Sequence, residues 1–182
     1  MTPDDITSHI YHWLRPLIRI ARLPHALGVP FPARATAGSV GYDLCAAITV
    51  GETLKARSTH GATGKVVVAD TGLTIPAHTV VLIPTGVVWE IPDGFEGQVR
   101  PRSSISRHPG VGIPNSPGTI DSDYRGEVRV AISTGRTPYT IQRGQRIAQM
   151  VIAPVALPSL VEVSPERLAA TDRGAGGFGS TG

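Results

Sequence analysis

The sequence predicts an all-β protein, because glycine and proline are frequent, apolar runs are short and long helical patterns are rare. The 182 residues include 21 glycines and 16 prolines, and 41% of the residues are hydrophobic. A chain of this length suffices for one domain with a sizeable core. We therefore expect many short strands joined by turns.

Composition narrows the class of protein further. The single cysteine, Cys45, leaves no intrachain disulfide and no cysteine-based zinc site, as in a reducing compartment. No apolar run is long enough for a transmembrane helix and no signal-peptide pattern precedes the domain, so we expect a cytoplasmic protein without membrane contact. The net charge of +3 comes from scattered residues, so we expect no stable nucleic-acid binding. A few arginines directed at one phosphorylated small molecule would explain the same balance.

Residues 1–17 are expected to form an extension outside the main domain. Thr2–Asp5 is typical of a helix start, and Pro16 would end the helix. Apolar residues of the extension recur at helical spacing, at Ile6, Ile10, Trp13, Leu14 and Leu17. We favour a short helix docked on the body over a helix that binds a membrane surface or a partner.

The body, residues 18–170, is predicted to be a series of short strands. The expected strands are Ile18–Leu23, Ala46–Val50, Lys65–Ala69, Leu73–Ile75, Thr79–Ile83, Gly86–Ile91, Gly97–Arg100, Tyr139–Ile141 and Arg146–Ile152. Residues 51–65 are polar, small and rich in glycine, and they predict a long exposed loop. Gly61–Lys65 within this loop lacks the Walker spacing and a following helix, so it does not indicate a phosphate loop.

The stretch Asn115–Glu127 predicts the first strand and turn of a β-hairpin, and Val128–Ile132 predicts the returning strand. A hairpin of this kind is a stiff support for a small-molecule site. Its chemistry-bearing side chains are Asn115, Asp121 and Tyr124. The alternative is a surface hairpin whose aspartates and glycines serve only the turn.

Three other segments carry polar side chains that have either a functional or a purely structural role. Arg102, Ser103 and Ser104 offer a guanidinium fork, hydroxyls and backbone N–H groups to an oxyanion, or they begin a helix. Asp43 lies between apolar neighbours at a strand start, where an aspartate alone is more often a turn or capping residue. Gln149 interrupts an apolar strip, and a lone glutamine of this kind is usually a satisfied edge residue.

The glycine-rich end of the chain, Asp172–Gly182, contains a formal GxGxxG pattern. Only three residues follow Gly179, so no helix can complete a dinucleotide-binding motif. The tail is either disordered or a flap that orders over a phosphorylated ligand. In the second case Phe178 would stack on the ligand, and Arg173, Ser180 and Thr181 would bind phosphate.

In order and spacing, these segments resemble the motifs of the trimeric dUTPases (deoxyuridine triphosphate nucleotidohydrolases). The motifs are Ala37–Leu44, Arg100–Ile105, Asn115–Glu127, Gly144–Met150 and Arg173–Gly182, and the likeness covers about residues 18–182. Val40 and Ser104 stand where the family usually has alanine and glycine. The resemblance implies a jelly-roll-like protomer and a homotrimer with three shared active sites. It also implies that the flexible tail, residues 171–182, closes over a neighbour's site.

The resemblance also implies a reaction and its residues. Asp121 would be the general base that activates a water for attack on the α-phosphorus of dUTP, giving dUMP and pyrophosphate. Mg²⁺ would bind the phosphates, with Asp43 contacting it through water. Phosphate oxygens would be positioned by Arg102, Ser103, Ser104 and Gln149, while Arg173 would neutralise charge as the tail closes. The cell would gain dUMP for dTMP synthesis and incorporate less uracil into DNA.

Selection of base and sugar would fall to the predicted hairpin and to the tail. Asn115 and the backbone of Gly118, Thr119 and Ile120 would meet the polar edge of uracil, leaving no room for the methyl group of thymine. Tyr124 would lie under the deoxyribose and clash with a 2′-hydroxyl. From the tail, Phe178 would cap the base, and Gly179, Ser180 and Thr181 would complete the pocket.

Two rival functions remain open at this point. A dCTP deaminase-like enzyme shares the Arg102–Ser104 pattern, but the Asp121–Tyr124 segment and the complete tail favour a dUTPase. A nucleotide-gated regulatory binding protein is the alternative from another class, with residues 1–17 or 51–65 engaging a partner. The histidines show no convincing zinc-ligand set, and no nucleophile-elbow pattern indicates a serine hydrolase.

Overall fold

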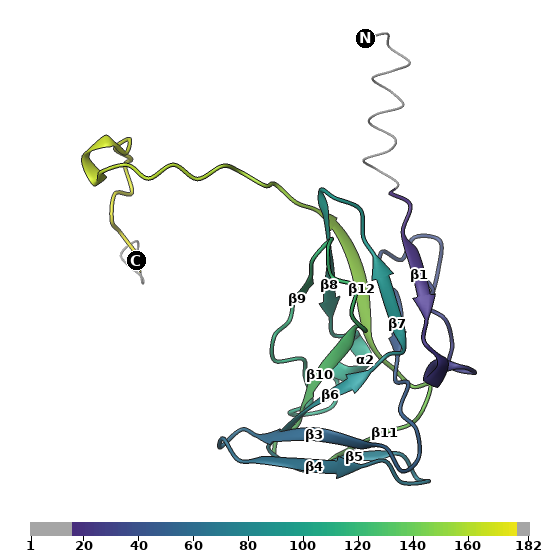
Figure 1. Cartoon of the computed structure of the whole chain (residues 1–182). Coiled ribbons are helices and arrows are strands. Elements are labelled where there is room, and N and C mark those ends of the chain that lie inside the picture. Colours follow the sequence, from purple (N-terminus) through teal and green to yellow (C-terminus); the bar gives the residue numbers. More distant parts are fainter. Residues whose placement is uncertain (1–15, 178–182) are drawn as a thin grey trace.

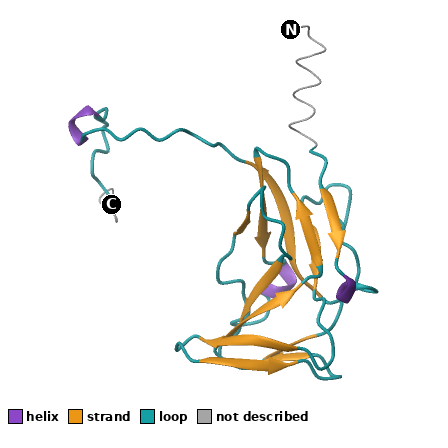
Figure 2. Ribbon diagram, in the orientation of Figure 1, coloured by secondary structure: helices purple, strands orange, loops and turns teal. Residues whose placement is uncertain are grey.

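The computed structural model describes residues 16–177 (Figure 1). The expected N-terminal helix, and the tail residues Phe178, Gly179, Ser180 and Thr181, lie outside these residues. Within them strands dominate, which confirms the all-β prediction (Figure 2). The helical content of residues 16–177 is one turn of α-helix and two 3-10 turns. None of these is long and apolar enough to cross a membrane.

The strands are short, and most of them coincide with the predicted segments. The elements in chain order are β1 (Arg19–Arg22), η1 (Pro24–Ala26), β2 (Tyr42–Cys45), β3 (Thr53–Ser58), β4 (Thr63–Val67), β5 (Leu73–Ile75), β6 (Thr79–Pro84), β7 (Val87–Glu90), β8 (Phe95–Arg100), α2 (Ser103–Ser106), β9 (Gly118–Ile120), β10 (Arg129–Ser133), β11 (Tyr139–Ile141), β12 (Arg146–Pro154) and η2 (Pro165–Arg167).

The strands form two four-stranded sheets and two two-stranded sheets. The orders are β10-β6-β3-β4 and β2-β12-β8-β9 for the larger sheets, and β1-β7 and β11-β5 for the smaller ones. Every strand pair is antiparallel. Neighbours in a sheet come from distant parts of the sequence, so the sheets bring together side chains that lie far apart along the chain.

Alternation along the strands explains the single main core. In β6, Val81 and Ile83 are fully buried while Leu82 between them is 52% exposed, because successive side chains point to opposite faces. Trp89 of β7 is also buried and meets Tyr42 edge-on, with ring centroids 5.9 Å apart. Burying an apolar side chain of this size stabilises the fold by about 1.5–3 kcal/mol.

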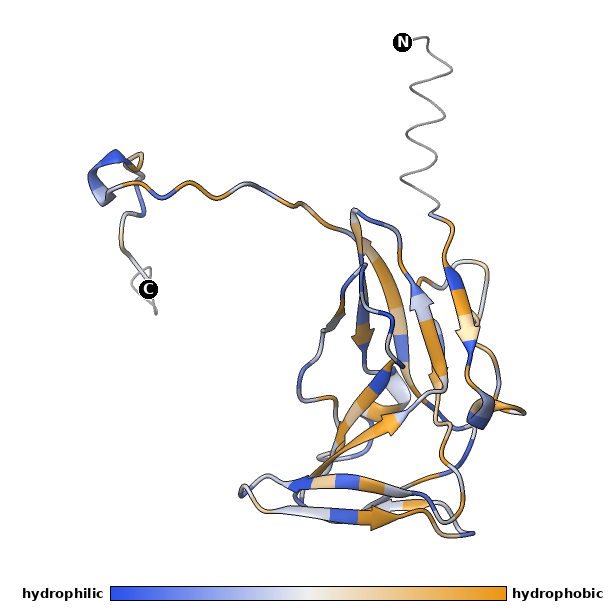
Figure 3. Ribbon diagram, in the orientation of Figure 1, coloured by the Kyte–Doolittle hydropathy of each residue, from blue (hydrophilic) through white to orange (hydrophobic). Residues whose placement is uncertain are grey.

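The prediction of a long loop at residues 51–65 is wrong, because this region forms the antiparallel hairpin β3–β4. Leu54 is buried and Ala56 half-buried, while Lys55 and Arg57 are exposed, so β3 follows the two-residue period of a strand. Figure 3 shows the resulting mixture of polar and apolar residues along the hairpin. Glycines and small polar residues, which usually mark loops, here occupy strand positions on an exposed hairpin.

The predicted hairpin of Asn115–Glu127 with Val128–Ile132 is also wrong. Its two halves do form strands β9 and β10, but β9 pairs with β8 whereas β10 pairs with β6. The turn between them is real, since Tyr124 N–H donates to the Asp121 carbonyl at 3.2 Å. The segment therefore crosses from one four-stranded sheet to the other, and both sheets hold it in place.

Smaller differences concern two more segments. Ala46–Val50 is not a strand, although Ala46 and Ile48 are buried. Gln149 is not at a sheet edge, because β12 lies between β2 and β8.

The body of the domain ends earlier than the predicted boundary at residue 170. Val155 N–H still donates to the Gly94 carbonyl at 2.9 Å, but residues 156–177 contain no strand and extend away from the sheets (Figure 1). Leu160 in this segment is 93% exposed. Chain that exposes large apolar side chains in this way has no core of its own to bury them.

Candidate functional site

The first group of predicted site residues comes from three neighbouring strands, β2, β12 and β8. Gln149 of β12 pairs with Asp43 of β2 on one side and with Arg100 of β8 on the other. Arg102 follows β8 directly and precedes α2, so it reaches the same region. The sheet register thus explains why these residues, distant in sequence, meet.

Asp43 is the centre of this group. Its Oδ1 accepts from Nε of Arg102 at 2.7 Å, and its Oδ2 lies 3.3 Å from Nη1 of Arg146. The side chains of Asp43 and Arg102 are 17% and 22% exposed, so this pair is shielded from water on most sides. One carboxylate between two guanidinium groups leaves an excess positive charge, which favours a bound anion.

Gln149 holds the turn that carries Arg102. Its Nε2 donates to the Pro101 carbonyl at 3.0 Å, and Nη1 of Arg102 lies 3.3 Å from Oγ of Ser104. Gly41 leaves the space that Gln149 needs, because a Cβ at position 41 would lie 2.2 Å from Oε1 of Gln149. These contacts fix the Arg102 side chain before any ligand binds.

A cavity of about 410 Å³ opens beside this group. Arg102, Ser104 and Arg146 line it, together with the rings of His108 and Tyr139, whose centroids lie 5.0 Å apart. Ser103, the first residue of α2, lies between Arg102 and Ser104 in the sequence and is exposed. Sequence reasoning missed Arg146, although the predicted strand Arg146–Ile152 begins with it; its contact with Asp43 appears only once β2 and β12 pair.

The second group extends from Asn115, before β9, to Tyr124, after it. Asn115 is exposed, and its Nδ2 would lie 2.9 Å from a Cβ at Gly118, so its amide folds back over that glycine. Thr119 and Ile120 continue β9, and Asp121 and Tyr124 are exposed beyond it. A carboxylate, an amide and an aromatic ring therefore occupy one short accessible segment.

Two arrangements fix the turn that follows Asp121. Nη1 of Arg125 donates to the carbonyls of Ser122 and Tyr124, at 2.6 and 3.0 Å. The Tyr124 hydroxyl donates to the Glu127 carbonyl at 3.1 Å. The tyrosine ring is thereby held at the end of the turn, where 42% of the residue remains exposed.

Within one chain, Asp121 and the first group lie at opposite ends of the β8–β9 pair, whereas Gly118, over which the Asn115 amide folds, lies at the end nearer Arg100. Ile120 pairs with Gly97, and Gly118 pairs with Val99. Ile120 therefore lies about 10 Å along the strands from the level of Arg100. Asp121 and Arg102 continue their strands in opposite directions, so one chain does not bring them together.

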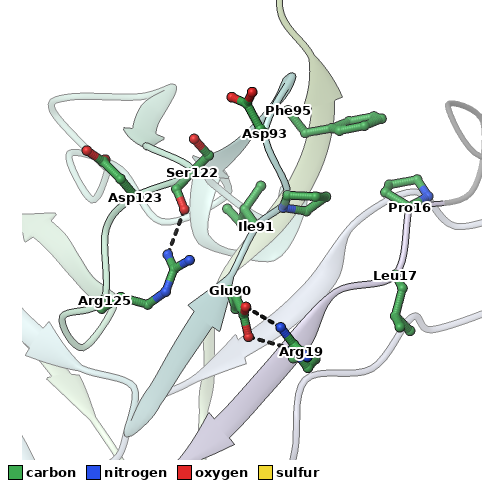
Figure 4. Close-up of a pocket in the computed structure, with 11 residues that line it drawn as sticks. Pro16, Leu17, Arg19, Glu90, Ile91, Asp93, Phe95, Ser122, Asp123 and Arg125 are labelled. Carbon is green, nitrogen blue, oxygen red and sulfur yellow. Dashed lines mark hydrogen bonds and ion pairs between the residues drawn. The ribbon is translucent and has the colours of Figure 1, made fainter.

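Another hollow, of about 750 Å³, lies beside the second group (Figure 4). Ser122, Asp123 and Arg125 line one side of it, and Arg19 and Glu90 line another. The bond from Arg19 lowers the pKa of the Glu90 carboxyl and raises the pKa of the guanidinium. Both charges are paired here, so we place the anion site in the smaller cavity beside Arg102.

The described part of the tail contributes one predicted site residue. Arg173 is exposed, and its Nε donates to the Gly176 carbonyl at 2.9 Å, which closes a local turn. Residues 16–177 contain no group of three or more histidine, cysteine or acidic side chains that would hold a metal ion. Both oxygens of Asp43 face arginines, so a metal in this site would depend on ligands from the bound molecule.

Comparisons with known proteins agree with this picture. The family model described as dUTPase matches residues 52–182. The deoxyuridine 5'-triphosphate nucleotidohydrolase of Methylocella silvestris is 48% identical over 91% of this chain and 91% of its own length. The protein of that name from Rhizobium rhizogenes is 45% identical over 92% of this chain and 95% of its own length.

A solved structure shares the fold. It is the dUTPase of Staphylococcus bacteriophage 80alpha, as the G164S mutant with dUpNHpp, with a TM-score of 0.65. It is 24% identical, and the match covers 92% of this chain and 99% of the phage protein. The family model spans the last four of the five motifs, two relatives match more than nine tenths of the chain, and the chain belongs to the dUTPase family.

Proposed function

We propose that this protein hydrolyses dUTP to dUMP and pyrophosphate. The proposal depends on the presence of two features in one chain. These are an anion site, built from Asp43, Arg102 and Arg146, and the accessible carboxylate of Asp121 on the turn after β9. The first suits a triphosphate, and the second suits activation of water. Relatives that share almost half of the sequence carry the name of this activity.

In the proposed reaction, Asp121 orients and deprotonates a water that attacks the α-phosphorus. General-base assistance of this kind contributes about 10²–10⁴-fold to a rate. Arg102 binds phosphate oxygens with the part of its fork that Asp43 and Ser104 leave free, and Ser103 and Ser104 add hydroxyl donors. Gln149 positions this turn through Pro101.

A magnesium ion fits this site as a companion of the substrate. We propose that the triphosphate supplies its direct ligands, because the described residues hold no carboxylate cluster and Asp43 is already paired with two arginines. Asp43 would then contact the ion through water. When bound, Mg²⁺ neutralises phosphate charge.

Selection of the nucleoside is assigned to the second group. Asn115 and the backbone of Gly118, Thr119 and Ile120 present donors and acceptors to the uracil edge. The side chain of Asn115 already lies against Gly118, which supports a narrow pocket without room for a methyl group. Tyr124 would pack under the deoxyribose and clash with a 2′-hydroxyl.

The separation of Asp121 from Arg102 within one chain supports a homotrimer with shared sites. Asp121 and Arg102 lie beyond opposite ends of β8–β9, so we propose that one protomer supplies the carboxylate and another the arginine. The tail would complete the site, with Arg173 on the phosphates, Phe178 on the base, and Gly179, Ser180 and Thr181 alongside. Residues 156–177 extend from the body, so they would let the tail reach the site of another protomer (Figure 1).

Hydrolysis of dUTP would limit uracil incorporation into DNA and supply dUMP for dTMP synthesis. We propose a cytoplasmic location, supported by a free, buried Cys45 rather than a disulfide.

A substrate panel tests the proposal. Pyrophosphate release from dUTP, dCTP, dTTP and UTP is measured with Mg²⁺, and ammonia release from dCTP is measured in parallel. Release of pyrophosphate from dUTP alone supports the proposal. Ammonia from dCTP without pyrophosphate from dUTP would identify a deaminase, and binding of nucleotides without turnover would indicate a regulatory binding protein.

A further inference from the structure

Glu127 makes more contacts than a residue after a surface turn needs. Its Oε1 accepts from the Gly86 N–H at 2.7 Å and lies 2.9 Å from Nε2 of His25. Its Oε2 accepts from Nε of Arg129 at 3.2 Å. The side chain is 10% exposed, so these partners, and not water, satisfy most of the carboxylate.

The partners of this carboxylate are themselves fixed. The Gly86 carbonyl accepts from the Leu23 N–H at 2.8 Å, and a Cβ at position 86 would lie 2.1 Å from Cβ of Ala26. The turn η1, which carries His25, therefore packs directly on Gly86. Nη2 of Arg143 also donates to the His25 carbonyl at 2.7 Å. Glu127 is thus anchored to backbone that has little freedom to move.

The backbone of Glu127 in turn holds the ring of Tyr124. The Tyr124 hydroxyl donates to the Glu127 carbonyl, and a Cβ at Gly126 would lie 2.3 Å from that hydroxyl oxygen. The next residue is also fixed, because Val128 N–H donates to the Val87 carbonyl at 3.0 Å. The ring thus rests on residues 126–127, whose position depends on the anchor of the Glu127 side chain.

We propose that Glu127 is a positioning residue that sets the discrimination between deoxyribose and ribose by holding Tyr124 in place. The inference rests on the proposed function, in which Tyr124 lies under the sugar. A ring that excludes a 2′-hydroxyl must not yield when the larger sugar enters. The Glu127 anchor supplies this stiffness, and His25 contributes to it from a part of the chain outside the five motifs.

The test compares kcat/KM for dUTP and for UTP in the full-length protein. Glu127→Gln keeps an acceptor for Gly86 but removes the charge that His25 and Arg129 face. We expect the dUTP-to-UTP ratio to fall about tenfold, the usual scale for weakening a charge-assisted hydrogen bond. His25→Ala removes one partner, and we expect the ratio to fall about threefold.

A matched control is Glu52→Gln, in which the altered carboxylate accepts from the Thr49 N–H at 3.0 Å in the loop before β3, and not at the turn after β9. Its ratio should equal that of the wild type. A loss of stability alone would lower both rates together and leave the ratio unchanged, so the ratio reports positioning. In a Tyr124→Phe background, Glu127→Gln should lower the dUTP-to-UTP ratio less than it does in the wild type, because the hydroxyl contact is already gone.

An unchanged ratio in a folded Glu127→Gln variant would overturn the inference, and so would an equal fall in Glu52→Gln. If Glu127→Gln does not fold, His25→Ala decides, and an unchanged ratio there overturns the inference as well. A wild-type protein that does not hydrolyse dUTP would overturn the proposed function itself. If the wild type prefers dUTP to UTP and the variants keep the same ratio, only the role of Glu127 is refuted.

Discussion

Gly41→Ala should damage the site much more than the fold. The glycine lies in the segment before β2, and its φ angle is not in the left-handed region, so alanine can adopt its backbone conformation. The added methyl group would lie 2.2 Å from Oε1 and 2.9 Å from Cδ of Gln149. The end of the Gln149 side chain must therefore swing away, and its bond to the Pro101 carbonyl is lost.

The magnitude follows from these contacts. A lost hydrogen bond costs about 1 kcal/mol, and a forced rotamer costs about 1 kcal/mol more. The melting temperature should fall by about 4–8 °C, since 1 kcal/mol corresponds to about 2–4 °C for a domain of this size. Arg102 loses the support of its turn, and we expect kcat/KM for dUTP to fall about 10–100-fold.

The assay combines thermal melting with steady-state kinetics. Gly38→Ala is the matched control, because a Cβ at that position meets nothing within 4 Å, and it should behave as the wild type. A Gly41→Ala protein with wild-type kcat/KM would refute the role assigned to Gln149. A protein that fails to fold would show that the neighbouring structure cannot adapt, against the reasoning that a flexible side-chain end moves aside.

Further predictions concern three side chains. Asp43→Asn removes the negative charge between Arg102 and Arg146, so the melting temperature should fall. Arg102 also loses the charged acceptor that orients it, so KM for dUTP should rise severalfold, as measured by kinetics. Burial raises the pKa of the Cys45 thiol, so a thiol reagent should label it slowly in the folded protein and quickly in denaturant. Because the folded pKa is raised, this thiol should also make stability fall as pH rises beyond its ordinary range, and Cys45→Ala should remove that fall. Arg19 lowers the pKa of Glu90, so this exposed pair should add a little stability at pH values above the ordinary pKa of a carboxyl, and that stability should be lost in acid. Glu90→Gln should abolish this small pH dependence, as measured by melting temperature across pH.

Local patterns predicted which residues are extended, but not which strands pair. Leu73–Ile75 and Tyr139–Ile141 were predicted with their observed bounds, because in each a threonine separates two large apolar residues, which is the alternation typical of a strand. The segments around Asp121 were also recognised as extended. Their assignment to one hairpin was wrong, because the pairing of β9 with β8 and of β10 with β6 depends on contacts distant in sequence.

The same limit applies to the site. Asp43, Arg102 and Gln149 were identified from motifs, and the structure brings them together in neighbouring strands. Arg146 and Glu127 were missed as interacting residues, because their partners belong to other strands and turns. An arginine at a strand start and a glutamate after a turn look like ordinary surface residues until the register is known.

The most direct test of this account is pyrophosphate release from dUTP by the wild type and by Asp121→Asn, with Mg²⁺ present. Asp121 is exposed and forms no part of the core, so the variant should fold and melt as the wild type does. We predict rapid release by the wild type and a rate at least 100-fold lower in the variant, the lower end of general-base assistance. Equal rates in the two proteins would contradict the assignment of the base, and no release by a folded wild type would contradict the proposed reaction.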